Sequence, residues 1–144
     1  MLEISPYIIA ALAAWVVAQG LKYVLASIKS KDLSSNKRQL YLSGGMPSAH
    51  SATAVALLVV IGLADGIDSA IFGLAALFTA VVMYDAMMVR RSSGEQGEAV
   101  IALIREQKSK VTIPRAAKGH SPIEVLAGAL IGVAIGCVVY FVTF

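Results

Sequence analysis

Charged residues are scarce in this chain of 144 residues. Asp, Glu, Lys and Arg together make up 15% of it, whereas apolar residues make up 58% and the mean hydropathy is +0.77. Soluble domains carry about 25% charged residues, so the shortage excludes an ordinary soluble domain and indicates an integral membrane protein. No basic run is interleaved with aromatic residues, so the net charge of +3 does not indicate binding to nucleic acid.

Cysteine occurs once, at Cys137 in the last apolar stretch. A single cysteine excludes an intrachain disulfide and leaves no second thiol for a metal site, so we interpret it as a packing residue. The chain also lacks internal repeats, low-complexity segments and the basic region of a signal peptide. We therefore expect one domain over residues 1–144, with its first apolar stretch retained.

Four apolar stretches approach the roughly 20 residues that a spanning helix needs. They cover residues 6–28, 46–63, 67–89 and 121–144. Only Ala64-Asp65-Gly66 separates the second stretch from the third, which predicts a tight turn and an antiparallel helical hairpin. The sequence therefore predicts an all-α, polytopic membrane protein built as a four-transmembrane-helix bundle.

The basic residues are distributed on one side of this expected bundle. All twelve lysines and arginines lie between Lys22 and Lys118, beside the two longer polar loops. Basic loops remain in the cytoplasm, so we expect both termini outside and both histidines at the cytoplasmic face. In the second loop, residues 98–108 are amphipathic, which predicts a cytoplasmic surface helix between the third and fourth spans that covers the site.

Small residues recur at helical spacing in three of the stretches. In the last one a stripe of every fourth residue begins with a histidine and a carboxylate and continues with glycines: His120, Glu124, Gly128, Gly132 and Gly136. Such a stripe is typical of a face that packs against other helices rather than lipid. Similar faces are expected in the first stretch, at Ala11, Ala14, Ala18 and Lys22, and in the third, at Gly73, Ala76 and Ala80.

The two histidines, His50 and His120, each begin an apolar stretch, where Lys22, Arg90 and Arg91 are expected nearby. Backbone N–H groups at a helix start and arginine side chains bind phosphate oxygens. One histidine is suited to attack phosphorus while the other protonates the leaving oxygen. Glu124 is placed one turn after His120, where it would hold the imidazole in one tautomer. Such a site requires neither a metal nor another cofactor.

Three motifs carry a resemblance to a known family. Met-Pro-Ser-Ala-His-Ser-Ala is similar to the Pro-Ser-Gly-His signature of the type 2 phosphatidic acid phosphatases (PAP2), which are related to acid phosphatases and vanadium-dependent haloperoxidases. His-Ser-Pro-Ile-Glu-Val-Leu-Ala-Gly resembles their last motif. With Asp-Ala-Met-Met-Val-Arg-Arg between them, these motifs most closely resemble the divergent PAP2 branch, over nearly the whole chain from Gln19 to Gly128.

The resemblance implies a metal-independent phosphatase in which His120 is the nucleophile, His50 is the general acid and Glu124 replaces the orienting aspartate. It implies phosphate binding by Lys22, Ser48, Arg90 and Arg91, with support from Asp85, Gln19, Gly45 and Ser51. Three positions depart from the standard pattern: the motif glycine is Ala49, Lys22 has no matching arginine, and Pro114 stands where an arginine is expected, with Arg115 one place away.

The expected position of the site at the membrane edge favours a lipid substrate, because a lipid head group at the interface reaches the site while its chains remain in the bilayer. Phosphatidylglycerophosphate, phosphatidic acid and polyprenyl pyrophosphate all fit, and the sequence does not choose among them. The alternatives are a non-catalytic lipid-phosphate binding or transport protein and a structural subunit, since basic residues often serve only as topology anchors and Ser48 is equally suited to cap a helix. Four short spans give little room to shield a site, which favours a homodimer.

Overall fold

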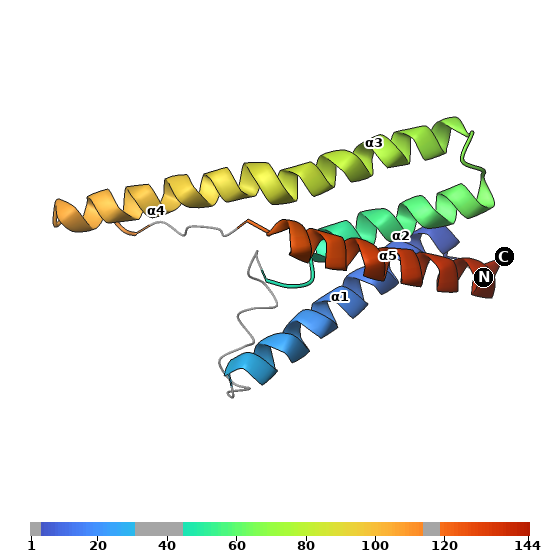
Figure 1. Ribbon diagram of the computed structural model, residues 1–144, viewed down its shortest axis with the longest axis horizontal. Helices are drawn as coiled ribbons and strands as arrows, with labels where there is room; N and C mark the ends of the chain where they lie inside the picture. The colour runs from blue at the N-terminus through green and yellow to red at the C-terminus, as the bar shows by residue number, and fades with distance from the viewer. Residues whose placement is uncertain (1–3, 31–44, 114–118) are drawn as a thin grey trace.

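The computed structural model describes residues 4–30, 45–113 and 119–144, and within these ranges every regular element is helical (Figure 1). The elements in chain order are α1 (Pro6–Ser30), α2 (Ala49–Ala64), α3 (Ala70–Tyr84), a π-helical turn η2 (Asp85–Val89), α4 (Arg90–Glu106) and α5 (Pro122–Thr143). The all-α membrane architecture predicted from the sequence is confirmed at this level. Three of the described helices are long and apolar enough to span a membrane, and α2 is a shorter apolar helix.

The helices α3 and α4 are one continuous rod joined by η2. Together they run over 37 residues, Ala70–Glu106, which corresponds to about 55 Å at the rise of an α-helix, against about 30 Å for the hydrocarbon core of a bilayer. Figure 1 shows α4 continuing the direction of α3 and extending beyond the other helices. Residues 98–106, most of the segment predicted as an amphipathic surface helix, are helical and form the end of this rod.

The central element is α2, which packs against α5, α1 and α3. It is rich in small and β-branched residues, and half of its 16 residues are buried. Thr79 of α3 donates its hydroxyl proton to the carbonyl oxygen of Ala54 at 3.2 Å, which ties the predicted α2–α3 hairpin together. Because α2 is enclosed by other helices, its short length is compatible with a position inside the protein.

Glycines on α5 let α2 approach it closely. A Cβ atom at Gly128 would lie 2.3 Å from the carbonyl oxygen of Ser48, and one at Gly132 would lie 2.5 Å from that of Ala52. The next pair, Gly136 with Ala56, repeats the arrangement at 2.9 Å. The contacts advance by four residues on both helices, so α2 and α5 run parallel. The α5 stripe therefore faces another helix, as predicted.

The buried face of α1 follows the predicted stripe closely, whereas that of α3 does not. In α1 the buried positions are Ala10, Ala14, Ala18 and Lys22, so the stripe begins one residue earlier than predicted. In α3 the buried residues are Ala75 and Thr79, while Gly73 and Ala80 are exposed. The predicted α3 face is wrong because small residues tolerate exposure as well as packing, and only the contact with α2 selects the face.

One end of the bundle carries the start of α1, the turn between α2 and α3, and the end of α5. Tyr7 donates its hydroxyl proton to Asp65 Oδ2 at 2.7 Å, and its ring lies 6.2 Å from that of Phe144. Gly66 adopts a φ of +88° in the turn, a left-handed conformation that favours glycine. The beginnings of α2 and α5 lie at the opposite end, which is where the histidines are.

Candidate active site

Two parallel helices begin side by side at this end. Ser48 is the N-cap of α2, and its backbone N–H donates to the carbonyl oxygen of Glu124 in the first turn of α5 at 3.0 Å. His50 is the second residue of α2, and His120 lies two residues before α5. The parallel packing therefore brings both histidines to the same end of the molecule, each beside a helix N-terminus, where the helix dipole favours an anion.

His120 is fixed through both its backbone and its side chain. Its backbone N–H donates to the carbonyl oxygen of Ala86 in η2 at 3.0 Å, and its Nδ1 lies 3.1 Å from Glu124 Oε2. The residue is only 4% exposed. Within the described part of the chain, Nδ1 is the ring nitrogen that has a hydrogen-bond partner. A carboxylate at Nδ1 holds the proton there and leaves the lone pair on Nε2.

Glu124 serves the helix start as well as the histidine. Its Oε2 accepts the backbone N–H of Ser121 at 3.0 Å, and its own N–H donates to Ser121 Oγ at 3.4 Å, which makes a capping box. Sequence reasoning missed this second role, although the signal was present: Ser-Pro-Ile-Glu has the spacing of a capping box with proline in the first helical position. The same carboxylate thus fixes both the entry of α5 and the imidazole.

Burial lowers the pKa of His120 below its usual value, because removing the imidazolium from water disfavours it. The hydrogen bond and the charge of Glu124 oppose this shift, while the positive charges of Lys22 and Arg90 add to it. At neutral pH the imidazole is therefore uncharged, which is the form in which Nε2 is a nucleophile.

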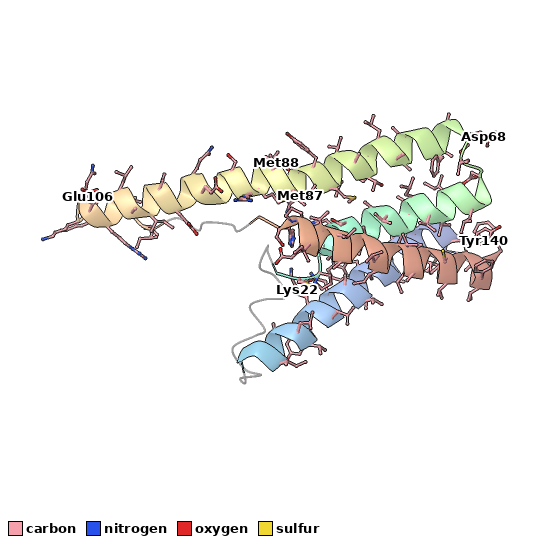
Figure 2. All side chains as sticks on the ribbon, in the orientation of Figure 1. Lys22, Asp68, Met87, Met88, Glu106 and Tyr140 are labelled. Carbon is pink, nitrogen blue, oxygen red and sulfur yellow. The ribbon has the colours of Figure 1, made fainter. Side chains whose placement is uncertain are left out.

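Lys22 projects from α1 toward the helix starts (Figure 2). It is 7% exposed, and its charge acts on His50, His120 and Glu124. Gly45 lies against it: a Cβ atom there would be 3.3 Å from Lys22 Cε, and the φ of Gly45 is +86°. Gln19 lies one turn earlier on α1 and is partly buried.

The two predicted arginines lie in different surroundings. Arg90 Nε pairs with Asp85 Oδ2 at 2.7 Å, and the Arg90 charge acts on both histidines. Arg91 Nε instead pairs with Glu95 Oε1 at 3.1 Å, with both side chains largely exposed on α4. Arg91 lines a cavity of about 270 Å³ whose other lining residues are Gly94, Glu95, Glu98, Gly119, His120 and Ser121. His120 borders this cavity; His50, Lys22 and Arg90 do not line it.

The serines of the first motif are engaged in capping. Ser48 is fully buried, and its Oγ accepts the backbone N–H of Ser51 at 3.4 Å and the Ser51 hydroxyl at 2.9 Å. The structural role anticipated for Ser48 is therefore present, and its hydroxyl is occupied by α2. The departures noted at Pro114 and Arg115 lie outside the described residues. Over residues 4–30, 45–113 and 119–144, no three His, Cys, Asp or Glu side chains gather in a way that would hold a metal ion.

A protein family and a bacterial membrane protein match most of this chain. The model of the family described as the Divergent PAP2 family matches residues 4–135, a range that includes Lys22, both histidines and Glu124. The uncharacterized membrane protein YuiD of Bacillus subtilis (strain 168) is 34% identical over 149 aligned residues, covering 93% of this chain and 93% of that protein. No solved structure matches the chain significantly. The chain belongs to the divergent PAP2 family of membrane proteins.

Proposed function

We propose that this protein is an integral membrane phosphatase that hydrolyses a lipid phosphomonoester or pyrophosphate through a phosphohistidine intermediate. The observation that carries the proposal is the parallel start of α2 and α5, which brings His50 and His120 to one end of the bundle. The two imidazoles are close enough for the charge of one to act on the other.

Phosphate binding follows from the groups around the histidines. Two helix N-termini present their positive ends to this region, and the cations Lys22 and Arg90 act on both imidazoles. Lys22 is largely removed from water, which strengthens its attraction for an anion. Arg90 offers planar N–H donors to phosphate oxygens, and its pairing with Asp85 orients it. We do not extend this role to Arg91, because its guanidinium pairs with Glu95 and both side chains are largely exposed.

The chemistry proceeds in two displacements. Nε2 of His120 attacks phosphorus and forms a P–N bond, while the bond from phosphorus to the leaving oxygen breaks and protonated His50 gives that oxygen its proton. His50 is then neutral and accepts a proton from water, whose oxygen attacks phosphorus. The P–N bond breaks, inorganic phosphate leaves, and both histidines return to their starting states. Glu124 supports the first step by stabilising the positive charge on His120 as Nε2 forms its bond.

The lipid substrate and the orientation in the membrane belong to the same proposal. Among the described residues, Lys22 lies at the histidine end, Arg90, Arg91 and Arg105 lie on α4, and Lys108 and Lys110 follow α4. The opposite turn carries Asp65 and Asp68. This asymmetry supports a cytoplasmic site with both termini outside. A phosphate at the membrane edge would reach the histidines while the acyl or prenyl chain stays in the bilayer, and a homodimer would shield the site further.

A second candidate is a non-catalytic lipid-phosphate binding or transport protein. The observation that favours it is the ion pairing of both arginines with carboxylates, Arg90 with Asp85 and Arg91 with Glu95. A phosphate that binds either arginine competes with these carboxylates. The two candidates differ in turnover: only the phosphatase releases inorganic phosphate.

The test is phosphate release by purified protein in detergent without added metal. The substrates are phosphatidylglycerophosphate, phosphatidic acid and a polyprenyl pyrophosphate, and the variants are His120→Ala and His50→Ala, with Glu106→Gln at the far end of α4 as a matched surface control. We expect release by the wild type and the control and its loss in both histidine variants. Equal release by all four proteins would refute the mechanism. Binding of orthovanadate without release from any substrate would favour the non-catalytic candidate.

A further inference from the structure

The long helix changes its hydrogen-bond pairing beside His120. In η2 the backbone N–H of Arg90 donates to the carbonyl oxygen of Asp85, five residues earlier, rather than four. A shift of this kind accommodates one extra residue in the turn and releases one carbonyl from its usual partner in the helix. The carbonyl oxygen of Ala86, a buried residue of η2, accepts the backbone N–H of His120 at 3.0 Å. The irregular turn thus supplies an acceptor that a regular helix would use internally.

Gly119 allows the chain to reach that acceptor. A Cβ atom at Gly119 would lie 2.4 Å from the backbone nitrogen of Arg91 and 2.6 Å from its Cα. These are backbone atoms of a helix, so the neighbour has little freedom to move aside. Glycine is therefore the residue that permits residues 119–120 to lie against the helix immediately after η2.

The same turn orients Arg90. In a regular α-helix, residues five apart point in directions that differ by about 140°, because each residue turns the helix by about 100°. Across η2, however, Asp85 Oδ2 and Arg90 Nε lie 2.7 Å apart. The wider turn brings both side chains to one face, the face from which the Arg90 charge acts on His50 and His120.

We propose that η2 is the positioning element of the site, with Ala86 and Gly119 as positioning residues for His120 and Asp85 as a positioning residue for Arg90. The inference rests on the proposed phosphatase function. His120 precedes α5 and so lacks the backbone pairing of a helix interior; its bond to Ala86 replaces that pairing. Displacing a reacting group by about 1 Å can lower a rate by about 10²-fold, so this anchor sets the rate of attack.

The first experiment compares Gly119→Ala with Gly73→Ala, an exposed helical position where an added Cβ would meet nothing within 4 Å. We expect Gly119→Ala to lower kcat about 10²-fold while KM changes less than about twofold, because the substitution acts on the position of His120 and not on the side chains proposed to bind phosphate. Gly73→Ala should match the wild type in both constants. An unchanged kcat in Gly119→Ala, or a rise in KM that accounts for the whole loss, would overturn the inference.

The second experiment measures hydrogen exchange of the His120 amide in the wild-type protein and does not depend on activity. We expect slow exchange in the wild type and in Gly73→Ala, and fast exchange in Gly119→Ala. Exchange of the wild-type amide at the rate of an unprotected peptide would overturn the inference even if the protein is a phosphatase. If the amide is protected but the protein releases no phosphate, the hydrogen bond from His120 to Ala86 is present and the proposed phosphatase function is wrong. The failure of this inference and the failure of the proposed function are therefore distinguishable.

Discussion

Glu124 Oε2 lies 3.1 Å from Nδ1 of His120, one helical turn earlier, and the same oxygen accepts the backbone N–H of Ser121 at 3.0 Å. The carboxylate therefore connects the start of α5 to the orientation of the imidazole. In a regular capping box the glutamate only caps the helix. Here it also fixes which ring nitrogen of His120 carries the lone pair.

Because Glu124 both caps α5 and carries a charge beside His120, the variants Glu124→Gln and Glu124→Ala distinguish the effects of these two roles. Glutamine at this position preserves a capping box but removes the negative charge that stabilises the imidazolium, so we expect kcat to fall about 10²-fold or more with little change in thermal stability. Alanine removes both functions and should also lower the free energy of unfolding by about 1 kcal/mol. Steady-state kinetics and thermal unfolding in detergent measure the two effects. Wild-type kcat in Glu124→Gln would contradict the orienting role.

The pH dependence follows from the lowered pKa of His120. The unfolded chain binds its proton near a pKa of about 6.5, whereas the folded protein binds it at lower pH. Between these two values the unfolded state holds more protons, so stability rises with pH there. The contribution of neutral His120 is thus fully present above about 6.5 and is lost as pH falls toward the folded pKa.

Activity should follow the same titration. We expect the acidic limb of kcat/KM that belongs to the nucleophile to lie below pH 6.5, because Nε2 attacks only when unprotonated. Replacing Lys22 with methionine removes a charge that lowers the pKa of His120 and should move this limb to higher pH. Thermal unfolding of His120→Asn provides the control, since it should lose the corresponding part of the pH dependence of stability. An acidic limb of kcat/KM above pH 6.5, if it belongs to His120, would be inconsistent with a buried neutral imidazole.

The glycines of α5 give a prediction about stability. A Cβ atom at Gly128 would lie 2.3 Å from the carbonyl oxygen of Ser48, so Gly128→Ala must separate the starts of α2 and α5. Overpacking of this kind typically costs about 1–3 kcal/mol. Gly20→Ala on α1 is the matched control, because an added Cβ there would meet nothing within 4 Å. We expect thermal unfolding in detergent to show a lower midpoint for Gly128→Ala and an equal or higher one for Gly20→Ala, since alanine favours a helix over glycine.

The parallel packing of α2 and α5 could be anticipated in part from the sequence. Glycines at every fourth position after Glu124 indicated a contact face, and that face brings His120 beside the start of α2. The capping box could also have been predicted, because Ser-Pro-Ile-Glu has serine and glutamate at the required spacing. These features depend on spacing within one helix, which a sequence displays directly.

The continuation of α3 into α4 and the turn η2 were not visible in the sequence. The segment Arg-Arg-Ser-Ser-Gly resembles a loop by composition, yet it is helical and its Gly94 is buried. Nothing in Asp-Ala-Met-Met-Val distinguishes a π-helical turn from a regular one. Its clearest partner is His120, more than thirty residues later in the chain, so tertiary contact rather than local preference identifies the element.

Arg90 and Arg91 have different surroundings, so their replacements should have different effects. Both are adjacent in the motif, but Arg90 acts on the two histidines while Arg91 pairs with exposed Glu95. We expect Arg90→Gln to weaken phosphate binding and lower kcat/KM by about tenfold or more, as expected for loss of a charge-assisted contact. Arg91→Gln should change kcat/KM by less than about twofold, because an exposed pair contributes little.

Asp85→Asn tests whether the ion pair orients Arg90. Asparagine retains a hydrogen-bond acceptor but removes the charge, so Arg90 should be held less firmly and KM should rise less than in Arg90→Gln. If Asp85 instead competes with phosphate for Arg90, the same variant would lower KM. Titration with orthovanadate separates these outcomes, because a freed Arg90 binds the phosphate mimic more tightly and a disordered one binds it more weakly. Equal effects of Arg90→Gln and Arg91→Gln on both kinetics and orthovanadate binding would show that the site does not distinguish the two arginines as this geometry requires.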